Sequence, residues 1–187
     1  TFMVANEKNN FKFSLKFFWV LVLCLLARLI PLRMPNIEPI MATMMPLSRA
    51  YGAFIGSSFA FSSILLYDTL TGTLGMQTFF TAGAYGMLGL WATYYFKKRQ
   101  GNTMDYVTFA ILGTLLFDSF TGLTVGPIFF HQSFLGSLVG QIPFTALHLL
   151  GNIAFAFILS PAVYKFLIKK RKEKILPHIN LLNPKTI

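Results

Sequence analysis

Two short segments that each contain an acidic residue repeat in this sequence. Residues 67–72 (YDTLTG) recur 50 positions later as residues 117–122 (FDSFTG), and further identities follow at the same offset. Each copy contributes an aspartate and a threonine at the end of an apolar run: Asp68 with Thr71, and Asp118 with Thr121. Such side chains bond the backbone of a local turn, or they face a cavity and bind a polar ligand or a cation. The sequence leaves both roles open.

The last apolar run carries three polar residues that a helix would place on one face. His148 and Asn152 are four positions apart, and Gln141 lies seven positions before His148. A polar stripe on an apolar helix normally faces the interior of a helical bundle. There it contacts a ligand or forms hydrogen bonds with neighbouring helices, and both roles stay open here.

Other polar and aromatic residues are expected at the same end of the helices. Asn36 and Glu38 open a short apolar run, and His131 lies in a later connection. Tyr85 and Phe130 are best placed to stack on a planar ring, and the acidic excess would suit a cationic or donor-rich ring. The expected substrate-binding residues are Asn36, Glu38, Asp68, Thr71, Tyr85, Asp118, Thr121, Phe130, His131, Gln141, His148 and Asn152.

The sequence lacks the motifs of several enzyme classes. It has no glycine-rich phosphate loop followed by Lys and Ser/Thr, no Gly-x-Ser-x-Gly elbow and no His-Glu-x-x-His pair. With one cysteine and three histidines, neither an internal disulfide nor a metal cluster is expected. We therefore expect a binding protein rather than an enzyme, with no metal and no cofactor of its own.

The composition places these residues in a membrane. Hydrophobic residues make up 55% of the 187 residues and charged residues only 12%, against about 25% charged in a soluble domain. The net charge of +10 comes largely from basic clusters at residues 8–16, 97–99 and 165–174, which flank apolar runs. Such clusters mark cytoplasmic segments of a multi-pass membrane protein and do not indicate a nucleic-acid surface.

The number of membrane crossings between two basic clusters must be even if both clusters are cytoplasmic, and this count predicts the arrangement of the helices. Three long apolar runs separate the first two clusters, so a further short crossing at residues 36–48 is needed to bring both clusters to the cytoplasmic side. After a helix at 104–118, one more complete crossing fits, from residue 141 to about 165. Residues 122–140 then form an apolar outer loop or a re-entrant segment. The expected fold is an all-α membrane protein with six transmembrane helices and both termini cytoplasmic.

One transmembrane domain is expected over residues 13–170. A cytoplasmic N-terminal segment at 1–12 precedes it, and a basic cytoplasmic tail at 171–187 follows. Small residues repeat every four positions inside it, at Gly52, Gly56 and Ala60. Such a stripe packs helices within a bundle or forms a docking face for another membrane subunit.

A family resemblance is carried by residues 34–40 (MPNIEPI), the two acid-containing segments, and the last polar stripe (QIPF at 141–144, HLLGN at 148–152). On these residues the chain resembles the substrate-binding S components of energy-coupling factor (ECF) vitamin transporters, in an uncharacterised branch. The resemblance implies a multi-pass protein of a prokaryotic plasma membrane. It would bind a water-soluble vitamin or a related micronutrient from outside.

The resemblance also implies partners. The ligand would be delivered through a transmembrane coupling subunit driven by two ATPase subunits, and only those partners would use ATP. Many family members carry an Ala-x-x-x-Ala contact in the first helix, whose nearest counterpart here is Cys24 and Ala27. The expected partner interface is Cys24, Ala27, Gly52, Gly56 and Ala60. A membrane-embedded structural or assembly subunit and a self-sufficient secondary transporter are the alternatives.

Overall fold

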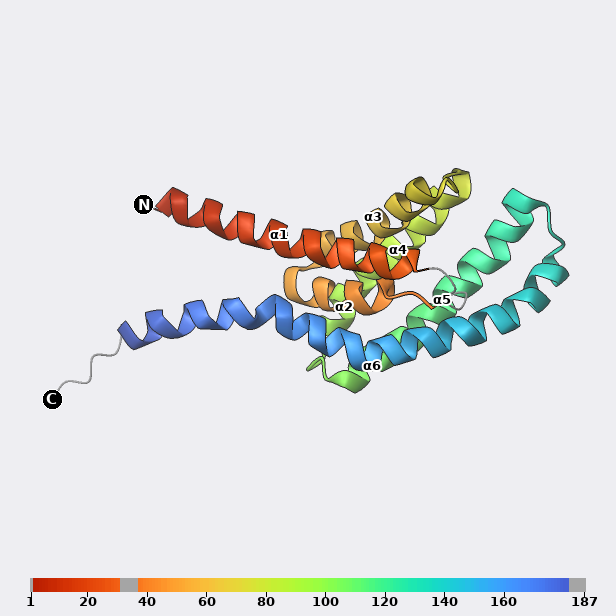
Figure 1. Ribbon diagram of the computed structural model, residues 1–187. Coiled ribbons are helices and arrows are strands. Elements are labelled where there is room, and N and C mark those ends of the chain that lie inside the picture. The colour runs from red at the N-terminus through yellow and green to blue at the C-terminus, as the bar shows by residue number, and fades with distance from the viewer. Residues whose placement is uncertain (1, 31–36, 182–187) are drawn as a thin grey trace.

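The computed structural model describes residues 2–30 and 37–181, and the side chains within 15–30 and 37–168. Its helices are α1 (Phe2–Leu29), α2 (Ile40–Tyr51), α3 (Ala53–Thr71), α4 (Met76–Lys97), α5 (Thr103–Phe130) and α6 (Phe134–Leu181). Within the described ranges every regular element is a helix, which confirms the all-α prediction with six helices. Successive helices alternate in direction, so the start of α1, the end of α6 and the α4–α5 loop lie toward the same end of the bundle (Figure 1).

The short helix α2 forms the centre of the bundle. Its residues from Ile40 to Ser48 are all buried, and α2 contacts each of the other five helices. Its 12 residues span about 18 Å, less than the roughly 30 Å of a hydrocarbon core. A helix with apolar side chains on all sides is stable where protein surrounds it. The predicted short second helix is confirmed, at residues 40–51 rather than 36–48.

Most of the segment at residues 122–140 is helical, so the prediction of an outer loop there is wrong, whereas the alternative of a re-entrant segment stays a prediction. α5 continues through Gly122 to Phe130, and only residues 131–133 separate it from α6. Gly122 lies inside α5, where an added Cβ would lie 1.8 Å from Oε1 of Gln141 on α6, whereas nothing lies within 4 Å of an added Cβ on Gly140. Glycine allows α5 and α6 to approach each other closely as a long hairpin.

Both terminal helices are longer than the apolar runs predicted. α6 begins at Phe134 rather than at residue 141, and it continues to Leu181 rather than ending near residue 165. α1 already begins at Phe2. Lysine, glutamate and leucine are good helix formers, so a basic segment can continue the helix beside it. Clusters of charged residues therefore show where an apolar run ends, but the helix itself can continue beyond that point.

The repeat is visible in the starts of two helices. α3 begins at Ala53 and α5 at Thr103, the same offset of 50 residues as the sequence repeat. α3 packs against α4 and α5 against α6, giving two hairpins beside α2 (Figure 1). The two copies differ after the acidic segment. α3 ends at Thr71, with Gly72 in the left-handed region at φ 71°, whereas α5 continues to Phe130.

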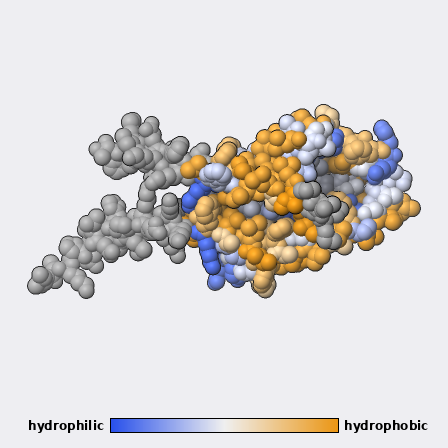
Figure 2. Space-filling view, viewed as in Figure 1, coloured by the Kyte–Doolittle hydropathy of each residue, from blue (hydrophilic) through white to orange (hydrophobic). Residues whose placement is uncertain are grey.

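Three of the described helices are long and apolar enough to cross a membrane, at Ala53–Thr71, Thr103–Phe130 and Phe134–Ile168. Large apolar side chains on them are exposed, among them Phe54 and Ile158 at 79% and 72%. Apolar residues also dominate the face of the molecule in Figure 2. Soluble monomers rarely expose apolar patches of this extent, so the surface indicates a membrane protein.

Small residues allow α2, α3 and α4 to pack closely. A Cβ on Gly56 would lie 1.8 Å from Oγ of Ser48, and one on Gly89 would lie 2.7 Å from the backbone nitrogen of Ser57. The Ser48 hydroxyl donates a hydrogen bond to the carbonyl oxygen of Gly89 at 3.0 Å. Ala60 is fully buried as well. Gly56 and Ala60 therefore pack helices inside the bundle, one of the two roles expected for their stripe.

We expect Gly89→Ala to destabilise the fold, because its Cβ would meet the backbone of α3 rather than a flexible side chain. The expected loss in the free energy of unfolding is roughly 1–3 kcal/mol. Gly83→Ala on the same helix is the matched control, since nothing lies within 4 Å of its added Cβ. Alanine there should gain about 0.5–1 kcal/mol in helix propensity. Thermal unfolding in detergent measures both, and equal stabilities of the two variants would contradict this packing.

Candidate functional site

A cavity of about 180 Å³ lies where α1, α3, α4, α5, α6 and the segment before α2 meet. Its lining combines ionisable, hydroxyl and apolar side chains: Arg28, Glu38, Ile64, Asp68, Thr81, Tyr85, Phe117, Phe144 and His148. Four of the predicted substrate-binding residues are among them, namely Glu38, Asp68, Tyr85 and His148. Ionisable residues inside an apolar bundle are costly and normally face a partner or a cavity. This cavity is the candidate site.

Arg28 connects three parts of the chain beside the cavity. Its Nη2 lies 3.2 Å from Oε1 of Glu38, and its Nη1 donates to the carbonyl oxygen of Ser63 at 2.8 Å. The guanidinium group also lies 3.8 Å from the ring centroid of Tyr67. Arg28 is only 4% exposed, and an opposite charge, a carbonyl and an aromatic face are the partners that a buried guanidinium requires. Glu38 thus binds to α1 as well as facing the cavity.

His148 forms the second polar group of the site. Its Nδ1 lies 2.7 Å from Oδ1 of Asp118 on α5, and its Nε2 lies 3.4 Å from the hydroxyl of Tyr85 on α4. A carboxylate only accepts hydrogen bonds, so Nδ1 of His148 carries the proton on this side. With a neutral imidazole, the Tyr85 hydroxyl then donates to Nε2. Asp118 is buried behind His148 and fixes the orientation of its ring.

Asn152 forms a second hydrogen bond between α5 and α6, one turn from the first. Its Nδ2 donates to Oγ1 of Thr114 at 2.8 Å. His148 and Asn152 on α6 thus pair with Asp118 and Thr114 on α5, and each pair of residues on one helix is four positions apart. Asn152 is 1% exposed and lies outside the lining of the cavity. Its role is interhelical bonding, whereas His148 combines interhelical bonding with a place in the lining.

The residues of the two acid-containing segments, 67–72 and 117–122, differ in what they contact. Thr71 and Thr121 each donate to the carbonyl oxygen four residues earlier, at 2.9 Å and 2.7 Å, so both act locally. Asp68 accepts a hydrogen bond of 2.6 Å from the Thr78 hydroxyl at the start of α4, and it also lines the cavity. The two threonines therefore take the local role expected for these segments, whereas Asp68 both bonds the start of α4 and lines the cavity.

Four other predicted residues lie away from the cavity or outside the described part. Gln141 donates to Oγ1 of Thr145, in the same helix, at 3.1 Å. Phe130 and His131 are exposed at the end of α5, where His131 adopts φ 53°. Asn36 lies outside the described residues. None of the first three lines the cavity.

Several lining residues were not predicted. Phe144 lies one helical turn before His148, and its ring and the ring of Phe117 each contact the imidazole edge-on, at 5.9 Å and 6.0 Å between centroids. The i, i+4 spacing from His148 was the signal for Phe144. Arg28 carried a stronger signal, as an ionisable residue at the end of an apolar run. Thr81 and Ile64 have no distinctive pattern in the sequence.

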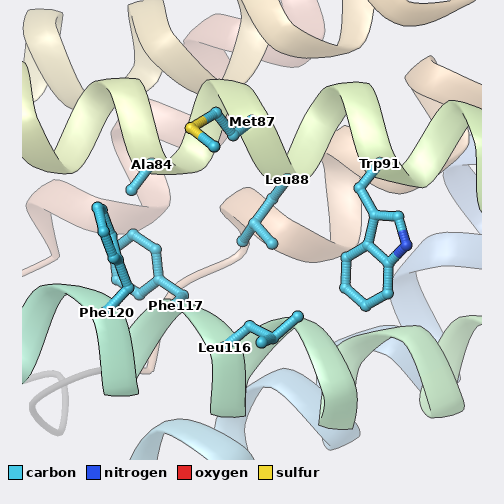
Figure 3. Close-up of a pocket in the computed structure, with 7 residues that line it drawn as sticks. All are labelled: Ala84, Met87, Leu88, Trp91, Leu116, Phe117 and Phe120. Atoms are coloured by element: carbon cyan, nitrogen blue, oxygen red, sulfur yellow. The ribbon is translucent and has the colours of Figure 1, made fainter.

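A second pocket, between α4 and α5, is almost entirely apolar. Figure 3 shows side chains of both helices pointing toward it, with Trp91 at one end and Phe120 at the other. Its volume is about 310 Å³, and Phe117 lines both this pocket and the polar cavity. Trp91 packs on Phe109 with ring centroids 4.6 Å apart. Because the polar groups of this lining amount to the indole N–H of Trp91, the polar cavity is the better candidate for a water-soluble ligand.

A third pocket is a groove of about 480 Å³ between α1 and α6, with α2 behind it. It is also apolar, and Cys24 and Ala27 line it from α1 together with Trp19. Phe155 and Leu159 are among the residues that line it from α6. The two residues predicted to contact a partner from the first helix thus lie in a groove.

The interhelical role of Asn152 is tested by a double-mutant cycle. We expect Asn152→Ala and Thr114→Val each to lower the free energy of unfolding, and the double variant to lose less than the sum. The coupling should be about 0.6 kcal/mol and at most about 1.7 kcal/mol, the range of such hydrogen bonds within membranes. Chemical unfolding in detergent measures it. Strictly additive losses would contradict the bond between the two side chains.

Comparisons of the chain with protein families, with curated proteins and with solved structures each find no match. The function is therefore inferred from the chemistry of the cavity itself.

Proposed function

We propose that this chain is a substrate-binding membrane subunit of an importer, of the kind found as S components in ECF transporters. In this role it captures a small water-soluble molecule in the polar cavity and delivers it through partner subunits. The observation that carries the proposal is the convergence of five ionisable side chains from five segments on one cavity of an otherwise apolar bundle: Arg28, Glu38, Asp68, Tyr85 and His148.

The arrangement of the polar groups supports binding rather than helix packing alone. Interhelical hydrogen bonds need only two partners, and the pair Asn152–Thr114 supplies such a bond without a cavity. At the cavity, in contrast, the polar groups leave a space of about 180 Å³ between them. A concave site with a few convergent polar groups and apolar walls is typical of small-molecule recognition.

A purely structural subunit is the main alternative. It would use the buried polar residues only to hold the helices together, and no small molecule would accompany the protein. A self-sufficient secondary transporter would bind a ligand but need no ATPase. The two alternatives therefore differ from the proposal in what is retained on purification and in what drives uptake.

The groove between α1 and α6 is the proposed contact with the coupling subunit. Its apolar lining suits a transmembrane helix of a partner, and Cys24 and Ala27 provide small residues for close approach. Gly52 lies outside the lining of the groove, and nothing lies within 4 Å of its added Cβ, so it stays available for a contact with a partner. Gly56 and Ala60, which pack inside the bundle, are not part of this proposed contact.

The first test is native mass spectrometry of the full chain purified from its own membrane. We expect a small molecule bound one to one, and at least a tenfold loss of the bound fraction in His148→Ala, because this change removes a wall of the cavity. Ile158→Ala on the same helix is the matched control, since Ile158 is 72% exposed and outside the lining. A wild-type protein that never retains a small molecule would favour the structural alternative.

The second test addresses the partners. Ala27→Trp fills the groove, so we expect co-purification of the coupling and ATPase subunits to fall severalfold while the ligand is still retained. Leu26→Trp is the control, because Leu26 is exposed on α1 and outside the groove. Undiminished co-purification with Ala27→Trp would exclude this groove as the contact. Gradient-driven uptake by the purified chain alone would instead support a secondary transporter.

A further inference from the structure

We infer that the ligand of the polar cavity is a small organic cation with several hydrogen-bond donors, such as a protonated amine or an amidinium group. This inference rests on the proposed function and specifies the chemistry of its substrate. Three observations carry it: the balance of charge at the cavity, the direction of its hydrogen bonds, and its aromatic walls.

The charges at the cavity do not cancel. Arg28 is neutralised by Glu38 at 3.2 Å, and Asp118 is paired with His148 at 2.7 Å. The first pair is neutral and the second carries a charge of 0 or −1. Asp68 adds one more negative charge, and among the described residues it has a hydroxyl partner, Thr78, but no cationic one. The charges of these five described side chains therefore sum to a negative value in either protonation state of His148, and a ligand with a positive charge compensates it.

The polar side chains that α3 and α4 contribute to the cavity use any hydrogens that they carry in bonds within the protein. Their oxygens are left to accept hydrogen bonds from a ligand. The single hydrogen of the Thr81 hydroxyl stays within its helix, where the carbonyl oxygens of Gln77 and Thr78 lie 3.0 Å and 3.1 Å away. With a neutral His148, the Tyr85 hydroxyl donates to Nε2. The oxygens of Thr81, Tyr85 and Asp68 then remain as acceptors. A ligand that donates several hydrogen bonds matches these groups, whereas a ligand that only accepts does not.

The apolar part of the lining is compatible with a cation. Phe117 and Phe144 are both lining residues, and aromatic faces attract organic cations, by about 2 kcal/mol where water is excluded. The volume of about 180 Å³ is close to that of six liquid water molecules, at about 30 Å³ each. The ligand is therefore smaller than most drug-sized molecules, on the order of ten non-hydrogen atoms.

Three planar probes of equal size separate charge from shape: benzamidinium, benzamide and benzoate. Their affinities for the full chain in lipid nanodiscs are measured by isothermal titration calorimetry after removal of any retained compound. We expect benzamidinium to bind at least tenfold more tightly than benzamide and benzoate not to bind. Benzamide or benzoate affinities equal to that of benzamidinium would overturn the inference, and so would the absence of benzamidinium binding.

The variant Asp68→Asn keeps the shape of the side chain and removes its charge. We expect the preference for benzamidinium over benzamide to fall below threefold in this variant. Asp105→Asn, the same change at the start of α5, should keep the full preference, since Asp105 is not a lining residue. A preference that survives Asp68→Asn would also overturn the inference. A retained natural compound that is neutral or anionic would refute the cationic ligand but leave the proposed binding function intact.

Discussion

The burial of an arginine in an apolar bundle is the constraint on which the rest of this structure depends. Arg28 cannot be hydrated in the interior, so it requires partners from other segments, and it finds them in Glu38, the Ser63 carbonyl and the Tyr67 ring. These contacts bring α1, the segment before α2, and α3 together at one place. Removing one partner of such a buried pair typically costs about 3–5 kcal/mol. The partners that the buried Arg28 guanidinium requires thus determine which residues of α1, of the segment before α2 and of α3 line the cavity.

The short helix α2 explains why there is space for a cavity. α2 is buried from Ile40 to Ser48 and fills the centre of the bundle. The cavity lies beyond its N-terminal end, where Glu38 precedes the helix. At this level the long helices α5 and α6 are held by two polar contacts, Asp118–His148 and Thr114–Asn152. His148 thus both links α6 to α5 and lines the cavity, so stability and ligand binding are coupled at this residue.

The sequence predicts the helices well where charge and apolar length determine them. It identifies six helices, the short second helix, and four residues that the structure brings to one cavity: Glu38, Asp68, Tyr85 and His148. The prediction of a loop at residues 122–140 is wrong, because a glycine in the sequence can either end a helix or let two helices pack closely. Glycine ends a helix at Gly72 but allows close helix packing at Gly122, and only the partner Gln141, 19 positions later, distinguishes the two cases. Long-range contacts of this kind are not visible in local patterns.

The binding role of the cavity is tested most directly by an experimental structure of the full chain purified from its native membrane without added ligand. We expect density for a small molecule in the cavity, within hydrogen-bond distance of the Asp68 carboxylate and the Tyr85 hydroxyl. A cavity that holds only water, or that is closed by rearranged side chains, with the Arg28 and His148 pairs intact, would contradict this role.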